Sequence, residues 1–577
     1  MKEKALHSFS KGMFSGIIQD ELVFPYPKMN NEEAENVAMM QDSFKKFAKD
    51  MMDVPKMDHD AKMPEEVLNG LKEMGFMGMQ IAEEYDGFGL SATAYTKMLA
   101  TISGVDGGTA ITVGGHQSIG VKALMKYGTD EQKKKYLPKL ATGEMVAAFG
   151  LTEPGAGSDA AGIQTKAVRN EKEGCYILNG SKLWITNGGI ADFFTVFAKE
   201  PIKGSDGKIE EKISAFIVTR DMPGVSSGQE ESKMGIKSSS TTAVFFEDVK
   251  VPFENLIGES GKGFKVAMHV LNSGRLGLAG GTLGGLKVLF QEALKHIVQR
   301  KQFGKTLDKF ELIKKKIAQV SIDLYAAESM VYLTTGMLDS GKVDYSLESA
   351  MCKIFATEVG WRGINECMQM VGGLGYMKEY PYERGLRDSR INMIFEGTNE
   401  ILRLFIALSG IQERGEYLKK IGHALKGPIK GFGVLTEYAS QWVKDRVSTE
   451  RIRDVDPSLS GPKVQFETWA RNLHFAAERA LVHNGKDIIY REMITERLAD
   501  AAIELYAMIA TISRVDTMIS EKGADACKQE ISICNVFCDQ AWRRARRNLL
   551  MVDNNNDRSM KELADFIVQE QKYPFET

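Results

Sequence analysis

The spacing of hydrophobic residues changes period twice along the chain. From about residue 31 to 150, and again from 263 to 410, apolar positions recur with helical spacing and stop at short polar breaks such as Gly87–Leu90. The second of these regions holds three or four long amphipathic segments, which is typical of a helix bundle. Residues 411–577 are again mostly helical in pattern, and the polar stretch Val447–Asp454 within them predicts a mobile linker.

Between the helical regions, from Gly150 to about Pro252, the pattern is that of strands. Short runs of β-branched and aromatic residues alternate there with turn residues. Asn179-Gly180 separates the first run from Leu183–Ile185, which is a strong signal for a hairpin turn. The chain is therefore predicted to be mainly α with a small antiparallel β domain. The predicted strands contain Cys175–Leu178, Phe193–Phe197, Ile213–Val218 and Ala243–Phe246.

The length of 577 residues is too great for one hydrophobic core, since domains usually hold about 150 residues. The changes of period predict four units. These are an N-terminal helical domain over 1–149, a β domain over 150–256, a helix-bundle domain over 257–410 and a helical C-terminal extension over 411–577.

Composition and charge exclude several classes of protein. Lys and Arg number 74 and Asp and Glu 77, so the net charge is −3 and no nucleic-acid surface is expected. Six cysteines do not make a disulfide framework in this length, which indicates a reducing compartment, and neither they nor the eight histidines have metal-site spacing. Without a visible targeting segment or a run of about 18 apolar residues, a bacterial cytoplasmic protein or a trimmed organellar one is expected.

The segment Phe395–Glu400, FEGTNE, is the most informative short string. Glu396 is followed by Gly397, whose missing Cβ lets a ligand approach the backbone closely. Thr398 suits a helix N-cap, and Glu400 in the first turn complements the dipole of the apolar helix that follows. The arrangement suits a general base aimed into a pocket, but an ordinary helix start has the same residues.

Two strings in the β region could contact a cofactor. Thr152–Asp159, TEPGAGSD, combines two glycines that permit close approach with hydroxyls that can bond a ring edge or a phosphate; a surface turn is the alternative. Trp184 and Thr186 lie two residues apart in a strand, so their side chains share a face and could pack on a planar ring. A strand tryptophan buried between domains is the alternative there.

Three further strings occur in the bundle region. Arg300–Lys305 ends a long helix, where arginine can bind phosphate or simply complement the helix dipole. Gln369–Tyr376 is a Gly-rich loop without the spacing of a Rossmann fingerprint, and a helix C-cap is its alternative reading. The glycines from Gly277 to Gly285 follow a helical pattern, so close helix packing explains them better than a nucleotide loop.

Taken together and in this order, five of these strings resemble the acyl-CoA dehydrogenase family. TEPGAGSD, WITNGG, RKQFGK, the Gln-x-x-Gly-Gly loop and FEGTNEILR all have counterparts there, over about residues 11–410. The C-terminal extension and the phrases HSFSKGMF and YLPKLATGE are similar to its very-long-chain branch. The resemblance implies an α domain, a β domain and a four-helix bundle, followed here by a helical extension.

The resemblance also implies a cofactor, FAD, between the β domain and the bundle, and it assigns residues by position. The FAD-binding residues would be Phe149, Leu151, Thr152, Gly157, Ser158, Trp184, Thr186, Thr398 and Glu400, with Arg300, Phe303, Gln369 and Gly373 reaching the FAD of the neighbouring subunit. The acyl-CoA contacts would be Ser158, Asn272, Arg275, Phe395 and Gly397.

Glu396 matches the catalytic base of the family. A thioester α-hydrogen is weakly acidic, and hydrogen bonds to the thioester oxygen stabilise the developing enolate; in the family they come from the backbone N–H of the base and a ribityl hydroxyl. Burial beside Phe395 is expected to raise the carboxyl pKa towards working pH. Some members carry the base on an earlier helix, just before an arginine. Gly274 holds that position here, before Arg275, so no second carboxylate competes.

Two departures and one helix bear on the substrate. Asn272 stands where medium-chain members have aspartate, and Glu311 where many members have glutamine. Asp106–His116 maps to the helix that bounds the acyl cavity, and its small residues favour a deep pocket and long substrates, although packing through glycine would use the same residues. His116 is expected to be an interior histidine rather than a catalyst.

The expected activity is dehydrogenation of long-chain acyl-CoA to trans-2-enoyl-CoA, the first step of fatty acid β-oxidation, with electrons passed to an electron-transferring flavoprotein. The very-long-chain branch implies a homodimer. The basic amphipathic segment Tyr417–Lys430 permits peripheral membrane contact, or it covers the dimer. Two alternatives stay open: an acyl-CoA oxidase, and a protein-binding scaffold, because one paralogue of the branch serves as an assembly factor. The intact Glu396 and the complete FAD strings count against a purely structural role.

Overall fold

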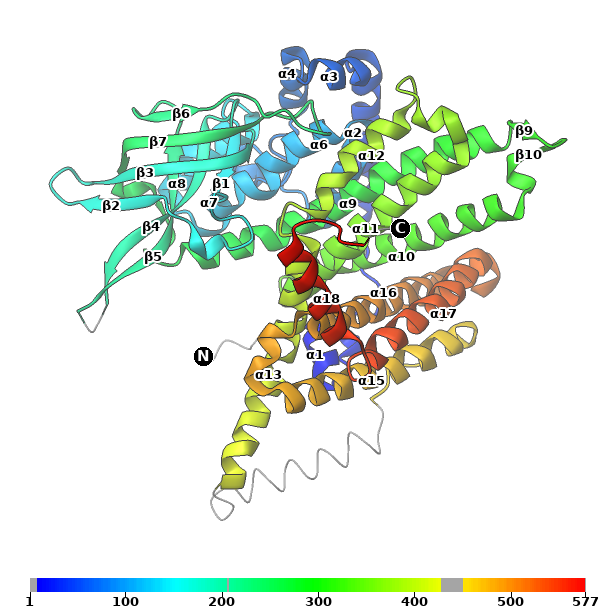
Figure 1. The fold of residues 1–577 in the computed structure, drawn as a ribbon. Coiled ribbons are helices and arrows are strands. Elements are labelled where there is room, and N and C mark those ends of the chain that lie inside the picture. The colour runs from blue at the N-terminus through cyan, green and yellow to red at the C-terminus, as the bar shows by residue number, and fades with distance from the viewer. Residues whose placement is uncertain (1–7, 205–206, 427–449, 576–577) are drawn as a thin grey trace. The chain divides into compact units, whose positions relative to one another are not determined.

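A computed structural model of the chain describes residues 8–204, 207–426 and 450–575 (Figure 1). It divides into two compact units. One is Pro27–Asn399, and the other combines Met1–Tyr26 with Glu400–Thr577. The N-terminal segment thus belongs with the C-terminal extension, and the four domain boundaries drawn from the sequence stay a prediction.

The larger unit begins with helices that pack around a common apolar core containing Val37, Phe44, Phe76 and Met98. Side-chain caps define several of their ends; Thr129 and Gln132, for example, form a capping box. A π-helical segment, Gly115–Gly120, joins α6 to α7, and such segments are frequent at functional sites. The helices are α2 (Asn31–Met51), α3 (Val54–Asp60), α4 (Glu65–Glu73), α5 (Ala92–Val105), α6 (Gly107–Gly114), α7 (Lys122–Tyr127) and α8 (Asp130–Thr142).

A twisted sheet follows, as the strand pattern predicted. Its strand order is β6-β7-β3-β2-β4-β5-β8, and the pairs are antiparallel except that β4 pairs in parallel with β1 and with β2. Each predicted run of β-branched and aromatic residues lies in a strand. The strands are β1 (Ala147–Gly150), β2 (Lys166–Asn170), β3 (Cys175–Thr186), β4 (Phe193–Lys203), β5 (Ile209–Thr219), β6 (Val225–Ser227), β7 (Thr241–Pro252) and β8 (Leu256–Ile257).

The hairpin turn predicted at Asn179-Gly180 is wrong. β3 continues through these residues and pairs with β7 on both sides of them, with a register shift between Leu178 and Gly180. A Cβ on Gly180 would lie 2.5 Å from Oγ1 of Thr165, so the glycine serves close backbone approach in a bulge instead of a turn. Asn179 donates from its side chain to Asp248 of β7 (2.9 Å), which ties the bulge to the neighbouring strand.

The rest of the larger unit is a bundle built on one long helix, α9 (Gly263–Ile297), which packs against α5 and α11. Two glycines of α9 confirm that the glycine run serves helix packing. A Cβ on Gly280 would lie 2.3 Å from Thr96, and one on Gly284 would lie 2.0 Å from the carbonyl oxygen of Ala100. The other elements are β9 (Lys301–Gln302), β10 (Lys305–Thr306), α10 (Glu311–Ser340), α11 (Ser346–Val371) and α12 (Pro381–Arg390).

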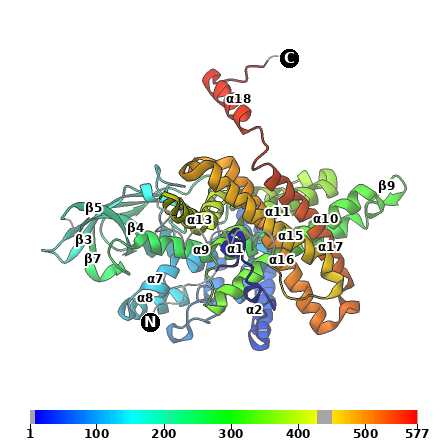
Figure 2. The same cartoon turned by 90° about the horizontal axis from the view of Figure 1, so that it is seen from below.

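The smaller unit is helical, as Figure 2 shows from below. α15, α16 and α17 pack side by side, and Phe9 of α1 contacts the rings of Phe466 and Tyr506. The predicted segments Tyr417–Lys430 and Val447–Asp454 lie partly outside the described residues. The helices are α1 (Phe9–Ser15), α13 (Asn399–Lys426), α15 (Ser460–Asn484), α16 (Glu492–Lys522), α17 (Lys528–Leu550) and α18 (Asp557–Glu570).

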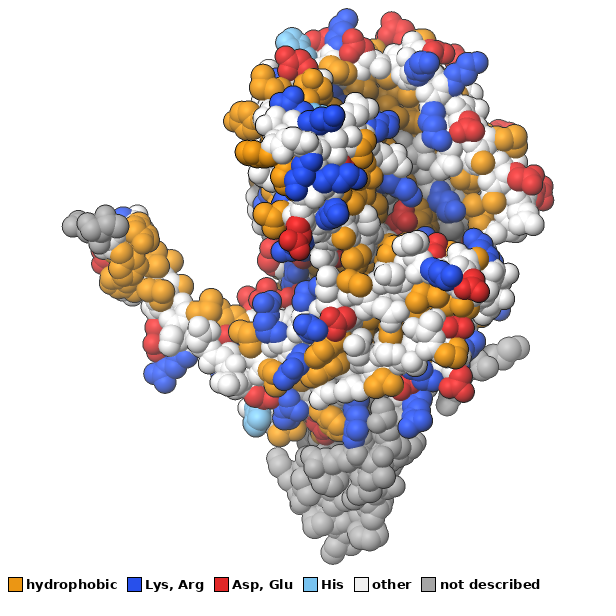
Figure 3. All heavy atoms as spheres, turned by 90° about the vertical axis from the view of Figure 1, so that its right-hand side faces the viewer, with side chains coloured by type: hydrophobic (Ala, Val, Ile, Leu, Met, Phe, Trp, Pro, Cys, Tyr) orange, Lys and Arg blue, Asp and Glu red, His pale blue; other side chains and the backbone are white. Residues whose placement is uncertain are grey.

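The surface carries charges of both signs. On the face shown in Figure 3, acidic, basic and apolar side chains are interspersed. Within the described parts of the chain, no helix combines the length and the apolar character that crossing a membrane requires.

A buried ion pair ties the TEPGAGSD string to the sheet. Nζ of Lys182, on β3, lies 2.6 Å from Oε1 of Glu153, and the two side chains are 0% and 6% exposed. Glu153 also accepts hydrogen bonds from the backbone and hydroxyl of Thr165. Burial lowers the pKa of Lys182 to about 8, so this ammonium depends on its partner to stay charged.

We expect Glu153→Ala to destabilise the larger unit by about 3–5 kcal/mol, because it leaves a buried ammonium without a counter-charge. Urea denaturation followed by circular dichroism measures the change. The double variant Glu153→Leu/Lys182→Met, which removes both charges, should lose less. A double variant that is no more stable than Glu153→Ala would contradict the assignment of the cost to the unpaired charge.

Candidate active site

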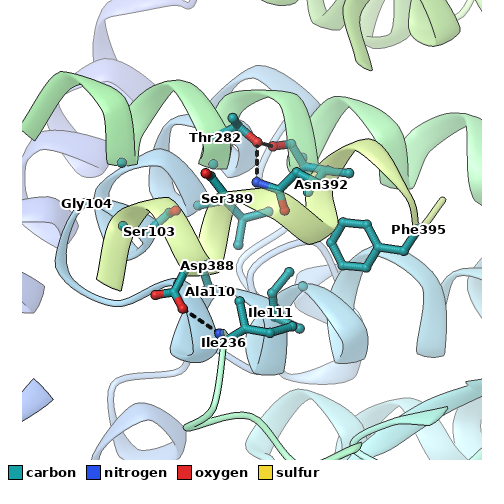
Figure 4. Close-up of a pocket in the computed structure, with 18 of the residues that line it drawn as sticks. Ser103, Gly104, Ala110, Ile111, Ile236, Thr282, Asp388, Ser389, Asn392 and Phe395 are labelled. Atoms are coloured by element: carbon teal, nitrogen blue, oxygen red, sulfur yellow. Dashed lines mark hydrogen bonds between the residues drawn. The ribbon is translucent and has the colours of Figure 1, made fainter. Parts of the chain in front are cut away.

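A cavity in the larger unit runs between α5, α6, α9 and α12, from Phe395 and Glu396 at one end to Ser103 and Gly104 at the other (Figure 4). It encloses about 1160 Å³ of space, its open mouth included. Most of its lining is apolar or small. Gly114 of α6 and Gly281 and Gly285 of α9 leave room for a side chain, because a Cβ at any of them would meet no atom closer than 3.6 Å.

Glu396 lies at one end of this cavity with its carboxyl group buried. Oε2 accepts no hydrogen bond from the described residues, and a Cβ on Gly274 would lie 3.5 Å from it. Burial raises the pKa of the Glu396 carboxyl, while the charges of Arg275 and then Lys353 oppose that shift. A carboxylate with a raised pKa and an uncommitted oxygen in an apolar cavity has the properties of a general base.

The backbone around Glu396 is held in an unusual conformation. Its φ is 58° and that of Gly397 is 91°, and the first value is uncommon for a residue with a side chain. Nε of Arg275 donates to the carbonyl oxygen of Glu396 (3.1 Å), and Nζ of Lys353 donates to that of Gly397 (2.9 Å). The sequence offered no sign of Lys353, since a lysine in a helical pattern is normally exposed.

Trp184 is a second strained residue near the cavity. Its φ is 55° at a register shift in β3, and the side chain is 62% exposed. Thr186, two residues on, lines the cavity. A large exposed aromatic side chain on a strained backbone indicates a binding surface, because strain persists where function requires it.

Two of the remaining residues predicted to bind FAD are glycines with open space beside them. A Cβ added to Gly157 or Gly373 would meet no atom within 4 Å, so a ligand can reach the backbone there. Phe149 and Leu151 are buried in and after β1, Thr152 is half-buried and Ser158 is exposed. Hydroxyls, an exposed indole and open glycines are a donor set that fits a flavin and its phosphates.

Five further residues predicted to bind FAD do not line the cavity. Arg300 and Phe303, at the β9–β10 hairpin, and Gln369, at the end of α11, are exposed; Phe303 is 93% exposed with φ 50°. Thr398 directly precedes α13, and Glu400 lies in its first turn. The FAD-binding roles of these residues and of Gly373 stay predictions, as do those of Phe149, Leu151, Thr152, Gly157, Ser158, Trp184 and Thr186.

Of the predicted acyl-CoA contacts, some lie at the cavity and others are hydrogen-bonded within the protein. Phe395 lines the cavity, and Gly397 follows the base. Arg275 is buried and also donates to Oδ1 of Asn272 (2.8 Å), so both of these side chains are engaged within the protein. Glu311, the other departure from the family pattern, is an exposed residue at the start of α10, and nothing in the structure explains it.

His116 is an interior histidine, as expected. Nδ1 accepts a hydrogen bond from the backbone of Ala147 (2.8 Å), and Nε2 lies 3.0 and 3.1 Å from the carbonyl oxygens of Met77 and Leu140. Burial lowers its pKa to about 4, so it stays neutral at physiological pH. These contacts give it a structural part.

Asp388 is a lining residue that the sequence did not reveal. It projects from α12 and accepts a hydrogen bond from the backbone of Ile236 (2.5 Å), as Figure 4 shows. Burial, followed by the field of Asp106, raises its pKa to about 7, while Arg384 and Arg387 oppose the shift. The far wall of the cavity therefore carries a group that titrates near neutrality.

Comparison with known proteins gives a consistent result. Three family models match: "Acyl-CoA dehydrogenase, N-terminal domain" over residues 34–144, "middle domain" over 148–249 and "C-terminal domain" over 261–410. A fourth, "ACAD9/ACADV, C-terminal domain", matches residues 457–573.

Individual relatives extend this result over nearly the whole chain. The very long-chain specific acyl-CoA dehydrogenase of Rattus norvegicus mitochondria is 42% identical over 561 residues, covering 95% of this chain and 84% of its own. An acyl-CoA dehydrogenase from Bacillus anthracis, solved in complex with FAD, has a TM-score of 0.79 and 33% identity, covering 99% of this chain and 97% of its own. A structure described as "Electron transferring flavoprotein of Acidaminococcus fermentans" has a TM-score of 0.62 and 37% identity, covering 66% and 98%.

We expect Asp388→Asn to remove a pH dependence of stability. Between the usual Asp pKa of 3.8 and the folded value of about 7, the folded protein holds a proton that the unfolded chain releases. The free energy of unfolding of the wild type should therefore fall, relative to that of the variant, as pH rises through this window. Urea titrations at pH 4.5, 6 and 7.5 measure the difference.

Asp58→Asn is the matched control for this series. Arg387 lowers the pKa of Asp58 in spite of its partial burial, so Asp58 is ionised in both states above pH 4.5 and its gap to the wild type should stay constant. A gap between the wild type and Asp388→Asn that is equally constant would show that Asp388 is not protonated in the fold.

Proposed function

The chain belongs to the acyl-CoA dehydrogenase family, and on this premise we propose that its substrates are long-chain acyl-CoA thioesters. It is a FAD-dependent oxidoreductase that converts acyl-CoA to trans-2-enoyl-CoA and passes the electrons to an electron-transferring flavoprotein. The observation that carries the assignment is the buried carboxyl group of Glu396 in an apolar cavity. Its pKa is raised, and its Oε2 accepts no hydrogen bond from the part of the chain that the structure describes.

Glu396 is the group that takes the α-proton. Its carboxylate must be ionised to act, and the two nearby cations favour the ionised form against the cost of burial. The apolar lining excludes water, which strengthens every electrostatic interaction inside the cavity. We propose that the backbone N–H of Glu396 donates to the thioester oxygen, where negative charge develops.

FAD supplies the acceptor for the hydride that leaves the β-carbon. The exposed indole of Trp184, the hydroxyls of Thr152 and Thr186, and the open backbone at Gly157 would hold it. We propose that Arg300, Phe303, Gln369 and Gly373 bind the FAD of a second subunit, because they are exposed and do not line the cavity. That arrangement requires a homodimer, which is also a proposal.

The preference for long chains rests on the glycines of α9. Gly285 is eleven residues beyond Gly274, which adjoins Glu396, so at 1.5 Å per residue it lies about 16 Å further along the helix. A Cβ on Gly281 or Gly285 would lie 3.6 Å from Ser103, an ordinary contact distance, so packing does not demand glycine at either position. The missing side chains leave the far cavity open.

A cytoplasmic location and peripheral membrane contact through the extension also remain proposals. The membrane contact rests on the basic amphipathic sequence of Tyr417–Lys430.

We expect Glu396→Gln to lower the rate of flavin reduction by acyl-CoA by about 10²–10⁴-fold, the usual contribution of a general base. The amide has the same shape but cannot take a proton. Anaerobic mixing with palmitoyl-CoA, followed by the loss of flavin absorbance, measures the rate, and the flavin content of the variant shows whether FAD binding persists. A flavin-containing variant with unchanged activity would show that another group is the base.

Gly285→Leu is expected to change the preferred chain length. A leucine there fills the far cavity, so kcat/KM for palmitoyl-CoA should fall by on the order of tenfold or more, since overpacking costs about 1–3 kcal/mol. The value for butyryl-CoA, which does not reach Gly285, should be unchanged. Gly285→Ala, with one methyl group, is the control and should affect palmitoyl-CoA least. An equal loss for both substrates would place the acyl chain elsewhere.

A further inference from the structure

Lys353 is a buried cation with two defined partners. The residue is 0% exposed on α11, and its Nζ donates to the carbonyl oxygen of Gly397 (2.9 Å) and to Oδ1 of Asn399 (2.8 Å). Burying an ammonium group costs several kcal/mol unless its hydrogen bonds and the local charge compensate. Both partners belong to the segment that carries the base.

The backbone of Glu396 and Gly397 is held by hydrogen bonds from two helices. Arg275 on α9 binds the carbonyl oxygen of Glu396, and Lys353 on α11 binds the next carbonyl oxygen, that of Gly397. Left-handed backbone at a residue with a side chain costs about 1–3 kcal/mol, and Glu396 adopts it with a φ of 58°. A rotation of the peptide after Glu396 or Gly397 would relieve that strain, and each cation opposes one of these rotations.

Asn399 extends the clamp on the α11 side. Its side-chain oxygen Oδ1 accepts a hydrogen bond from Lys353. Its side-chain nitrogen Nδ2 donates to Oγ1 of Thr357 (3.2 Å) and to Oε1 of Glu358 (3.2 Å). Asn399 is 3% exposed and begins α13, so the chain is fixed immediately after the base.

We propose that Lys353 is a positioning residue for catalysis: its ammonium clamps Gly397 and Asn399 and so keeps the Glu396 carboxylate aimed at the substrate α-carbon. The proposal rests on the proposed function and deepens it. Lys353 acts through the backbone and through its charge and does not touch the substrate.

The charge of Lys353 has a separate, measurable effect. The groups whose fields act on Glu396 are Arg275 from α9 and Lys353 from α11, and both lower the pKa that burial raises. Glu358, also on α11, faces Asn399 and partly offsets the ammonium. Removing the Lys353 charge therefore leaves Glu396 harder to ionise, and a purely structural lysine would not move that titration.

The test uses the FAD-loaded protein and the variant Lys353→Met. The rate constant for flavin bleaching by palmitoyl-CoA is measured anaerobically from pH 5.5 to 9. The wild-type rate rises with pH as Glu396 ionises. In Lys353→Met the midpoint should move up by on the order of one pH unit, and the plateau rate should fall by about 10–100-fold because the base is less well placed.

Three further variants serve as controls for packing, for charge and for a failure of Lys353→Met to fold. Cys352→Ala, at the adjacent buried position of α11, controls for general loss of packing and should leave the midpoint unchanged. Lys353→Arg keeps the charge and should keep the midpoint. Asn399→Asp keeps the oxygen that accepts from Lys353 but adds a negative charge, so it should raise the midpoint with the lysine in place, even if Lys353→Met fails to fold.

The outcomes separate this proposal from the proposed function. If palmitoyl-CoA, butyryl-CoA and acyl-CoA thioesters of intermediate length all fail to bleach the wild-type flavin, the proposed function is overturned. The positioning role of Lys353 is then overturned with it. If the wild type is bleached but Lys353→Met and Asn399→Asp keep both its midpoint and its plateau rate, only the role of Lys353 is overturned.

Discussion

A carboxylate must remain able to ionise at the end of an apolar cavity, and much of the larger unit is arranged around that constraint. Burial raises the pKa of Glu396 and so disfavours its ionised form, because a charge is costly where water is excluded. Two buried cations, Arg275 from α9 and Lys353 from α11, offset that cost. The same cations bind the carbonyl groups beside the base, so electrostatics and geometry are set by one pair of contacts.

The long helix α9 serves this arrangement in two ways. Along one part of its surface, Gly280 and Gly284 let α5 approach so closely that no side chain would fit. Gly281 and Gly285 have room for a methyl group, and their absent side chains widen the cavity instead. One glycine-rich run thus brings the helices together and keeps space open between them, according to which way each residue faces.

Local strings predicted much of the site and the fold, and the reasons are physical. Strand periodicity and β-branched residues identified the sheet, since each strand exposes alternate side chains to the core. Glu396 could be proposed as the base because a carboxylate, a glycine and a helix start are adjacent in sequence. The dipeptide Asn179-Gly180 gave a wrong prediction because Asn-Gly is also the usual sequence of a hairpin turn. Here the glycine is required for close approach to Thr165.

The sequence by itself therefore determined the class of fold and the family and singled out Glu396 as the candidate base, because these depend on neighbouring residues and on periodic patterns. Only the tertiary structure decided that Lys353 and Arg275 hold the base, that Asp388 faces the far cavity and that residues 1–26 join the C-terminal extension. Those contacts join residues tens to hundreds of positions apart, and burial, which turns an ordinary lysine into a clamp, exists only once distant segments pack together.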